Sequence, residues 1–515
     1  MSSRRDAWLR VLDAPWHPAL VALYPLLALF AFNESELFLT ELPEPAGLAL
    51  AGTLLAWALF ALPFGARRGA IVASIAAALF FSYGHVVLAV ARARIEHPWL
   101  SDRYVDPVWG AAFLAALVVA WVLRKRPVKV TRALNVVALF LVAMPAAQIV
   151  AYEVGDRTWT APEASASIAG AGAAEPPNVY FVMLDGYAHE ETLLDVYGYD
   201  NREFLDALRA RGFYVVPESR SNYAMTTLSL PSMLNLRYLE GLPPDSTDRT
   251  VAHEMVRRSD LARFFREHGY RYVHFNSGFG PTTYEVEADW TVECGRLTEF
   301  QRALVTTTPI MLFAPDIIAS QDRERTLCQL ELLEEMPGTE GPFFVFAHIL
   351  APHPPYLFDA DGGIVDPGDP VADGLIQSPA EQGRKQEMYV AQLQYTNTRV
   401  LGLVDGILAR EARPPVIVFM SDHGPDSLEV TLADWSDPSP EFLMERLRNF
   451  EAVHLPPEAD RSLLYETMTP VNVLRVVLDA EFGTSLGRLE DRSWFSTYER
   501  PFDWRDVTEQ VDFEP

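Results

Sequence analysis

Five apolar stretches near the N-terminus constrain the fold of this chain more than any other feature. They are roughly Pro18–Asn33, Gly47–Phe64, Ala70–Ala91, Val108–Leu123 and Ala133–Ala151. Each is close to the roughly 20 residues that cross a bilayer as a helix. None has a charge at its centre, where a charge costs at least about 2.5–3.5 kcal/mol. A cleaved signal peptide would explain only the first stretch. The pattern therefore predicts a membrane domain of five transmembrane helices over residues 1–154.

The charges of the predicted loops indicate how this domain is oriented. Ten basic residues fall on one side of the membrane: Arg4, Arg5, Arg10, Arg67, Arg68, Arg124, Lys125, Arg126, Lys129 and Arg132. The loops on the other side carry only Arg92, Arg94 and Arg103. Because Lys and Arg are enriched in cytoplasmic loops, we expect a cytoplasmic N-terminus. With five crossings, everything after about residue 152 would lie outside the cell membrane, in a periplasm or at the cell exterior.

A second domain follows a segment rich in Ala, Gly, Ser and Pro at residues 155–177, which is typical of a linker. The chain has 515 residues and a net charge of −27. Residues 1–155 hold 13 of its 42 basic and 10 of its 69 acidic residues, so the negative charge lies in the C-terminal part. An acidic domain is a poor partner for nucleic acid. A phosphate ester could bind there only beside a local cation, and a bound metal would serve.

The two cysteines, Cys294 and Cys328, form no CxxC pattern, which excludes a zinc–thiolate site of the usual spacing. They form one disulfide in an oxidising compartment, or they are two unpaired apolar side chains. The predicted topology favours the disulfide.

Residues 178–515 alternate between strand and helix patterns, which predicts an α/β domain with a largely parallel central sheet flanked by helices. Strands are expected at Asn178–Asp185, Phe213–Val216, Arg271–Asn276, Phe343–Ile349 and Val416–Ser421, and helices at Arg202–Arg211, Asp260–His268, Gln382–Arg410 and Thr469–Phe482. Ligands in such folds bind at the carboxyl ends of the strands. The stretch Pro281–Ala319 has loop and helix signals without a clear packing face.

Carboxylate and imidazole side chains gather at the predicted strand ends. Asp185 closes the first strand, Asp422 and His423 close the strand at 416–421, and His348 and His353 lie at the end of the strand at 343–349. This residue set suits Zn²⁺ or Mn²⁺. Taken singly, His348 is equally well explained as a hydrogen-bonded core histidine and His353 as a loop residue held by prolines.

A hydroxyl is expected beside these groups. The sequence SNYAMTTLSLPSMLNL at Ser221–Leu236 is a polar turn, which includes Asn222, followed by a helical pattern with Thr226 at the helix start. Threonine at this place commonly caps a helix. The same place, at the positive end of the helix dipole, also favours an alkoxide and binds anions.

Together and in this order, NVYFVMLDGY, TTLSLP, HPPY and SDHG resemble the sulfatase-like branch of the alkaline phosphatase superfamily. The plan of the chain is similar to membrane enzymes such as lipoteichoic acid synthases and phosphoethanolamine transferases. These have a helical membrane domain followed by an extracytoplasmic catalytic domain. The resemblance covers about Asn178 to Phe482 and includes the five-helix anchor.

The resemblance implies roles for individual residues. Asp185, Asp422 and His423 are expected to bind one or two divalent ions together with Thr226, which would be the nucleophile. Thr227 is the rival nucleophile. His353 would contact the transferred group or its leaving group, and His348 and Asn222 would contact substrate. The substrate would be a membrane lipid or an envelope glycan.

The sequence departs from the family in ways that bear on function. Classical sulfatases carry a Cys/Ser-x-Pro-x-Arg motif, and no such motif is present. A membrane-bound phosphotransferase or phosphodiesterase is therefore favoured over a sulfatase or a phosphatase. An alternative of another class is a catalytically silent domain that binds envelope polymers, against which the retention of Asp185, Thr226, Asp422 and His423 argues.

Overall fold

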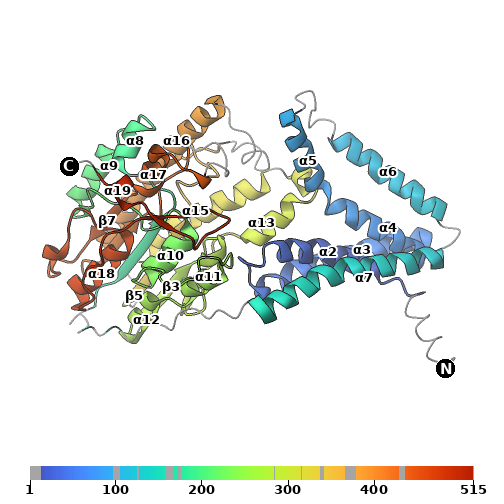
Figure 1. Cartoon of the computed structure of the whole chain (residues 1–515), viewed down its shortest axis with the longest axis horizontal. Helices are drawn as coiled ribbons and strands as arrows, with labels where there is room; N and C mark the ends of the chain where they lie inside the picture. The colour runs from blue at the N-terminus through green and yellow to red at the C-terminus, as the bar shows by residue number, and fades with distance from the viewer. Residues whose placement is uncertain are drawn as a thin grey trace. The chain divides into compact units, whose positions relative to one another are not determined.

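The computed structural model describes residues 13–96, 105–123, 127–156, 168, 170, 176–283, 285–314, 316–336, 341–365, 379–427 and 435–513. The chain forms two compact units (Figure 1). The first, which we call the anchor unit, comprises residues 1–160 and 299–317, and the second, the α/β unit, comprises residues 161–298 and 318–515. Most of the predicted linker at 155–177 lies outside the described residues, so that prediction remains untested.

Each of the five apolar stretches forms helix in the anchor unit. The helices are α2 (His17–Phe32), α3 (Pro43–Phe64), α4 (Ala66–Phe80), α5 (Tyr83–Glu96), α6 (Val105–Leu123) and α7 (Pro127–Ala151), with short turns η1 (Leu39–Glu41) and η3 (Tyr152–Asp156). The third stretch is interrupted between α4 and α5. Three segments of the described residues, 39–64, 66–90 and 127–155, are long and apolar enough to cross a membrane. α2 and α6 are shorter, so five crossings remain a prediction.

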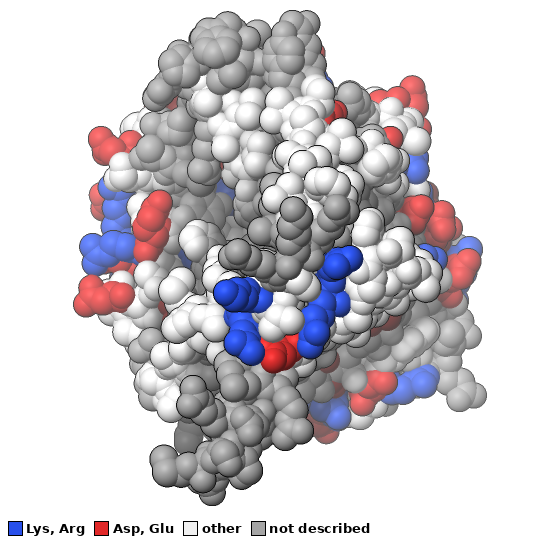
Figure 2. Space-filling view, turned by 90° about the vertical axis from the view of Figure 1, so that its right-hand side faces the viewer, with Lys and Arg blue, Asp and Glu red and all other residues white. Residues whose placement is uncertain are grey.

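One end of the anchor unit carries paired charges. Arg132, near the start of α7, donates from Nε to Asp13 Oδ1 at 2.5 Å. Arg67, near the start of α4, donates to the Asp13 carbonyl. Figure 2 views the molecule from the right-hand side of Figure 1 and shows basic side chains gathered around an acidic group. Arg67 and Arg132 are among the basic residues that were assigned to the cytoplasmic side.

Seven strands form the sheet of the α/β unit, in the order β2-β7-β6-β1-β5-β3-β4. They are β1 (Val179–Leu184), β2 (Tyr214–Val215), β3 (Arg271–Phe275), β4 (Trp290–Val292), β5 (Phe343–Ile349), β6 (Val416–Met420) and β7 (Glu451–His454). β1 lies between β5 and β6 and is parallel to both. β7 runs antiparallel to β6 and to β2. The prediction of a mostly parallel sheet is confirmed, and every predicted strand is present within about two residues, the boundary error expected of assignment methods.

Helices cover both faces of the sheet (Figure 1). They are α8 (Glu190–Asp195), α9 (Arg202–Ala210), α10 (Thr226–Leu234), α11 (Thr250–Arg257), α12 (Asp260–Glu267), α15 (Ile317–Glu335), α16 (Pro379–Arg410), α17 (Pro440–Leu447), α18 (Pro470–Phe482) and α19 (Thr508–Val511). Alternate residues of β1 pack against the helices on opposite faces of the sheet. Tyr180 and Val182 pack in the cluster that contains α9 and α16 residues, whereas Phe181 and Met183 pack with residues of α10, α12 and α18. The all-apolar sequence of β1 follows from this burial on both faces.

Cys294 and Cys328 form a disulfide in the α/β unit, with a sequence separation of 34 and Cα atoms 5.7 Å apart. The alternative of two unpaired cysteines is therefore wrong. The segment between them contains two further helices, α13 (Glu299–Thr306) and α14 (Ile310–Phe313), which belong to the anchor unit.

We expect Leu403→Ala to lower the free energy of unfolding of the α/β unit by about 2–5 kcal/mol, because Leu403 on α16 is 1% exposed and its truncation leaves a cavity. Leu194→Ala on α8 is the matched control. Leu194 is 55% exposed, and its change should stay within about 0.5 kcal/mol. Urea unfolding followed by tryptophan fluorescence measures both. Equal effects of the two substitutions would contradict this account of the core.

Candidate metal and phosphoryl-transfer site

Two neighbouring parallel strands bring three potential metal ligands to one edge of the sheet. Asp185 follows β1 directly, and Asp422 and His423 follow β6 after Ser421. β1 and β6 pair in register, Met183 opposite Met420, so their carboxyl ends lie side by side. One ligand atom from each of Asp185, Asp422 and His423 lies within 4.8 Å of the other two, and all three side chains are buried.

Glycines let the chain turn sharply behind two of these ligands. Gly186 has φ +68°, a conformation that other residues rarely adopt, and its N–H donates to Asp422 Oδ1 at 3.3 Å. A Cβ atom on Gly424 would lie 2.0 Å from the carbonyl oxygen of Glu445 on α17. The glycines of the LDG and SDHG sequences are therefore required by this packing.

Thr226 is the first residue of α10, and its hydroxyl reaches the same cluster. Thr226 Oγ1 lies 3.0 Å from His423 Nε2. The side chain is 9% exposed. Met225, which precedes it, makes no side-chain cap, so Thr226 lies inside the helix and is not its N-cap. Its position at the helix N-terminus adds the positive end of the dipole to the site.

The cluster fits a bound cation because its acceptors face one another. His423 Nδ1 lies 2.8 Å from the Gly424 carbonyl, which places the proton on Nδ1 and the lone pair on Nε2. That Nε2 atom is only 3.0 Å from Asp422 Oδ2. Asp422 Oδ2 and Asp185 Oδ1 are buried without a hydrogen-bond partner. Buried acceptors in this arrangement repel one another unless a proton or a metal ion lies between them.

The surroundings shift the pKa values of the two carboxyl groups in opposite directions. Burial, followed by the charge of Asp185, raises the pKa of Asp422 to about 6. Burial opposes ionisation of Asp185 as well, but His353, His348 and His423 outweigh it and lower the Asp185 pKa. Burial and the nearby Arg446 guanidinium hold the pKa of His423 well below its usual value, so the imidazole stays neutral.

His348 contacts one of the three potential metal ligands, Asp185. His348 Nε2 lies 3.1 Å from Asp185 Oδ2, and its Nδ1 lies 2.9 Å from Thr282 Oγ1. The side chain is fully buried. With both ring nitrogens engaged, His348 orients Asp185, and the expectation that it contacts substrate is not supported.

Asn222 also has its polar atoms occupied. Its Nδ2 donates to the Arg492 carbonyl at 2.8 Å, and its Oδ1 accepts from the Val471 N–H at 3.0 Å. The side chain is 1% exposed. Asn222 therefore fastens the turn before α10 to the C-terminal segments, and the structure does not offer it to a substrate.

His353 lies at the border of the cluster and is half-buried. Its ring centroid is 6.2 Å from that of His423, and its Nδ1 lies 2.7 Å from the Pro354 carbonyl. Its backbone N–H donates to the Asp185 carbonyl at 3.0 Å, which links the HPPY loop to the end of β1. Because Nδ1 is the donor, Nε2 is the ring atom that remains for a substrate.

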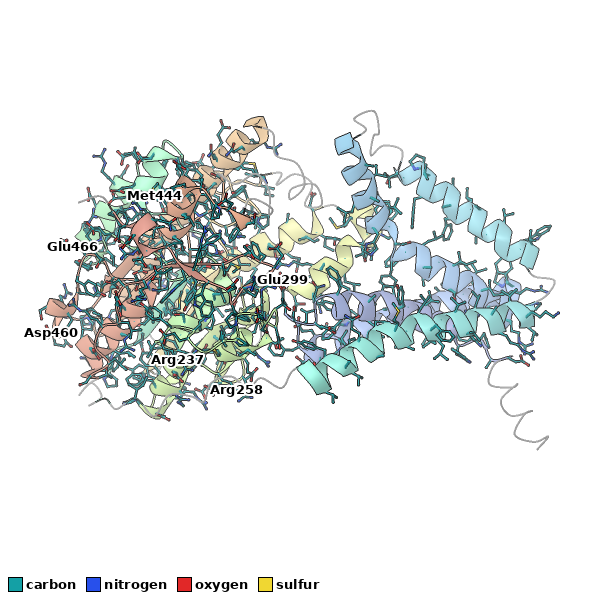
Figure 3. The ribbon with its side chains drawn as sticks, in the orientation of Figure 1. Arg237, Arg258, Glu299, Met444, Asp460 and Glu466 are labelled. Atoms are coloured by element: carbon teal, nitrogen blue, oxygen red, sulfur yellow. A yellow bond between two sulfur atoms is a disulfide. The ribbon has the colours of Figure 1, made fainter. Side chains whose placement is uncertain are left out.

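Arg446 is a member of the site that the sequence motifs did not reveal. It lies on α17, two residues after Met444, which Figure 3 labels. Its guanidinium donates to the carbonyls of Ala224 and Gly424 and to His423 Nε2, at 2.7, 3.0 and 3.0 Å. The residue is 2% exposed. A buried arginine among backbone carbonyls, beside His423, is a fixed positive charge for an anionic group. Its one sequence signal is a basic residue in the apolar part of a helix.

The family described as Sulfatase matches residues 177–446, more than half of the chain. Among curated protein sequences, none matches.

Several solved structures are similar. One is the integral membrane protein lipooligosaccharide phosphoethanolamine transferase A from Neisseria meningitidis, with 14% identity, 92% of this chain and 97% of that chain covered, and a TM-score of 0.40. The C-terminal periplasmic domain of EcEptC from Escherichia coli, in complex with Zn, has 13% identity, 68% and 96% coverage and a TM-score of 0.46. A 2-O GAG sulfatase has 14% identity, 63% and 78% coverage and a TM-score of 0.38.

We expect the affinity of the protein for Zn²⁺ to rise with pH until Asp422 is ionised. Because the Asp422 pKa is raised to about 6, a proton must leave before the metal binds, so the affinity should fall about tenfold for each pH unit below about 6 and level off above it. Isothermal titration calorimetry at several pH values measures this dependence. Asp422→Asn should weaken binding and remove the slope. An affinity for Zn²⁺ that does not change with pH would contradict the raised pKa of Asp422.

Proposed function

Because the chain belongs to the sulfatase family, we propose that it is a metal-dependent, membrane-bound phosphotransferase or phosphodiesterase that uses Thr226 as its nucleophile. The observation that carries this proposal is the contact between the Thr226 hydroxyl and His423 Nε2, inside the cluster of three buried ligands. Thr227, the rival nucleophile, is the next residue on α10 and has no such contact with His423.

The identity of the nucleophile favours phosphate over sulfate esters. The formylglycine sulfatases need Cys or Ser in a Cys/Ser-x-Pro-x-Arg motif, and the partial match on α10, Ser229-Leu-Pro-Ser-Met, has Met233 in place of Arg. Ser229 is buried, and its hydroxyl donates to the Tyr223 carbonyl at 2.9 Å. Hydrolysis of sulfate or phosphate monoesters is the alternative activity within the same site.

Asp185, Asp422, His423 and Thr226 would hold a divalent ion, with Zn²⁺ or Mn²⁺ best suited to the donor set. Such an ion would lower the pKa of a hydroxyl and neutralise phosphoryl oxygens. Thr226 Oγ1 would lose its proton to water and attack phosphorus in line, forming a P–O bond while the bond to the leaving oxygen breaks. A second acceptor, water or a lipid or sugar hydroxyl, would then take the phosphoryl group from Thr226.

Two side chains of the site serve this reaction directly. The leaving oxygen must gain a proton, and His353 Nε2 is the half-buried ring atom placed to supply it. The Arg446 guanidinium would lose its acceptor on His423 once Nε2 binds metal, and its N–H group would then be available to an equatorial phosphoryl oxygen. The acidic surface makes these local cations the sites at which an anionic ester could bind.

We expect the protein to lie in the cytoplasmic membrane with its α/β unit on the outer side. Basic residues are concentrated in the loops assigned to the cytoplasm, and the Cys294–Cys328 disulfide is typical of an oxidising compartment. Anchoring favours lipid or envelope-glycan substrates. Protease protection in spheroplasts tests this topology, because digestion of residues 178–515 from outside is expected and their full protection would contradict it.

A silent scaffold is the alternative from another class, and metal binding separates it from the enzyme. An enzyme of this kind should retain or rebind close to one divalent ion for each chain, measured by elemental analysis. A chain that binds no divalent ion would favour the scaffold.

We expect peptide mass spectrometry of the full-length protein, after incubation with mixed phospholipids and Zn²⁺ or Mn²⁺, to find a mass added at Thr226. The in-line displacement leaves a covalent adduct on the attacking oxygen, and its mass identifies the transferred group. Thr226→Ala should carry no adduct, and Thr227→Ala should carry it unchanged. An adduct on Thr227 would contradict the assigned nucleophile, and bound metal with turnover but no adduct would favour the hydrolase.

Arg446→Met should lower kcat/KM on a phosphodiester by about 10²–10³-fold, the usual effect of removing one transition-state donor. Zn²⁺ affinity should persist, because Arg446 is not a ligand and its positive charge disfavours the cation. Arg448→Met is the matched control. Arg448 lies two residues away and bonds to Val511 and Asp512 carbonyls at the C-terminus, so its loss should leave kcat/KM within a few-fold. Loss of metal binding in Arg446→Met would show that Arg446 is structural instead.

A further inference from the structure

A segment of the C-terminal part of the sequence leaves the α/β unit and joins the anchor unit. Residues 299–317 belong to the anchor unit, although the sheet continues on both sides of them in sequence. We call residues 299–314, which contain α13 and α14, the excursion. Figure 3 labels Glu299, its first residue. It lies within the stretch Pro281–Ala319, whose sequence pattern predicts no clear packing face.

The base of the excursion is fastened within the α/β unit. The Cys294–Cys328 disulfide joins the segments that precede and follow it. Arg325 reinforces this link, because its guanidinium donates to the carbonyls of Cys294 and Leu297 and pairs with Asp322 at 2.7 Å. Arg325 and Asp322 are both buried. These contacts hold the two ends of the excursion at fixed positions in the α/β unit.

The excursion contacts one end of the anchor helices. Phe300 is 2% exposed and packs in a cluster with Phe30 and Ile149, edge-to-face with Phe30 at 6.2 Å. Gln301 Nε2 donates to Glu44 Oε2 at 2.9 Å. The Gly84 N–H donates to the Thr307 carbonyl at 3.0 Å. Phe30 and Ile149 lie near the C-terminal ends of α2 and α7.

That end is opposite the charged pair at Asp13. α2 runs from His17, close in sequence to Asp13, to Phe32, and α7 runs from Pro127, near Arg132, to Ala151. The excursion therefore packs at the end of these helices that the loop charges assign to the outer face of the membrane. With that orientation, the excursion would lie at the outer ends of the anchor helices.

The tip of the excursion exposes apolar side chains. Phe313 is 87% exposed and Leu312 is 41% exposed. Residues 303–315 contain no charged side chain, although the part of the chain after residue 155 is acidic overall. Adjacent exposed apolar residues on an uncharged segment mark an interaction site. At the level of a bilayer surface, the partner with matching chemistry is the boundary between lipid headgroups and acyl chains.

We propose that the excursion is an interfacial membrane-binding element, with Leu312 and Phe313 inserted into the outer leaflet. Phe300 fixes it to the ends of α2 and α7, and the disulfide fixes its base. The inference concerns placement at the bilayer and does not rest on the proposed catalytic activity. A second copy of the chain or a protein partner would be the other occupants of the same apolar tip.

The test is a fluorescent probe at the tip of the full-length protein. Because Cys294 and Cys328 are paired, Phe313→Cys introduces a single reactive thiol for an NBD label, and labelling near one mole per mole confirms that the disulfide is intact. The labelled protein is reconstituted into phosphatidylcholine–phosphatidylglycerol vesicles, with and without lipids brominated close to the headgroup. Ile364→Cys is the matched control, since Ile364 is an apolar residue of the α/β unit that is 82% exposed.

We expect blue-shifted emission at position 313 and about twofold quenching by the brominated lipids, as for side chains buried a few ångströms into the interface. The label at position 364 should show neither effect. Leu312→Cys should reproduce the result with weaker quenching.

Either of two results would overturn the proposal. Red-shifted, unquenched emission at 313, equal to that at 364, would place the tip in water. Blue-shifted emission without quenching by brominated lipid would mean that protein, such as a second copy, covers the tip.

Discussion

The mutual repulsion of three buried acceptors at the ends of β1 and β6 is the constraint around which the α/β unit is organised. Asp422 Oδ2 and His423 Nε2 are 3.0 Å apart, and Asp185 faces them from the neighbouring strand. A folded chain keeps such groups together only if the surroundings fix them and a proton or cation separates them. The surrounding contacts do fix them. His348 restrains Asp185, the Gly186 N–H binds Asp422, and the Gly424 carbonyl binds His423.

Arg446 connects this constraint to the rest of the fold. The Gly424 turn packs directly against α17, and α17 supplies the guanidinium that contacts both Gly424 and His423. The ligand turn and the arginine therefore keep a fixed relation to each other. In a strongly acidic unit, this arrangement fixes one buried positive charge beside the three acceptors.

The sequence predicted the parts of this structure that depend on local pattern. β1, β5 and β6 are short apolar runs, and the polar residues after them were expected at one edge because parallel strands share their carboxyl ends. Arg446 escaped notice because its role depends on α17 packing over the Gly424 turn, a contact between segments that no local pattern encodes. Asn222 and His348 were given substrate contacts, but tertiary partners, the Val471 N–H and Thr282, occupy their polar atoms. The excursion was also unpredicted, because Phe300 packs on Phe30 of α2 and Ile149 of α7, which are distant from it in sequence.

The membership of residues 299–317 in the anchor unit bears on how the protein can be divided. A boundary drawn at the linker separates Phe300 from Phe30 and Ile149, and the apolar face that they cover becomes exposed to water. A catalytic fragment beginning near residue 178 would then carry this face and the Phe313 tip together, without lipid. Such a fragment would tend to self-associate for reasons unrelated to its active site. Removing residues 299–317 while keeping the Cys294–Cys328 disulfide would follow the boundary between the two units.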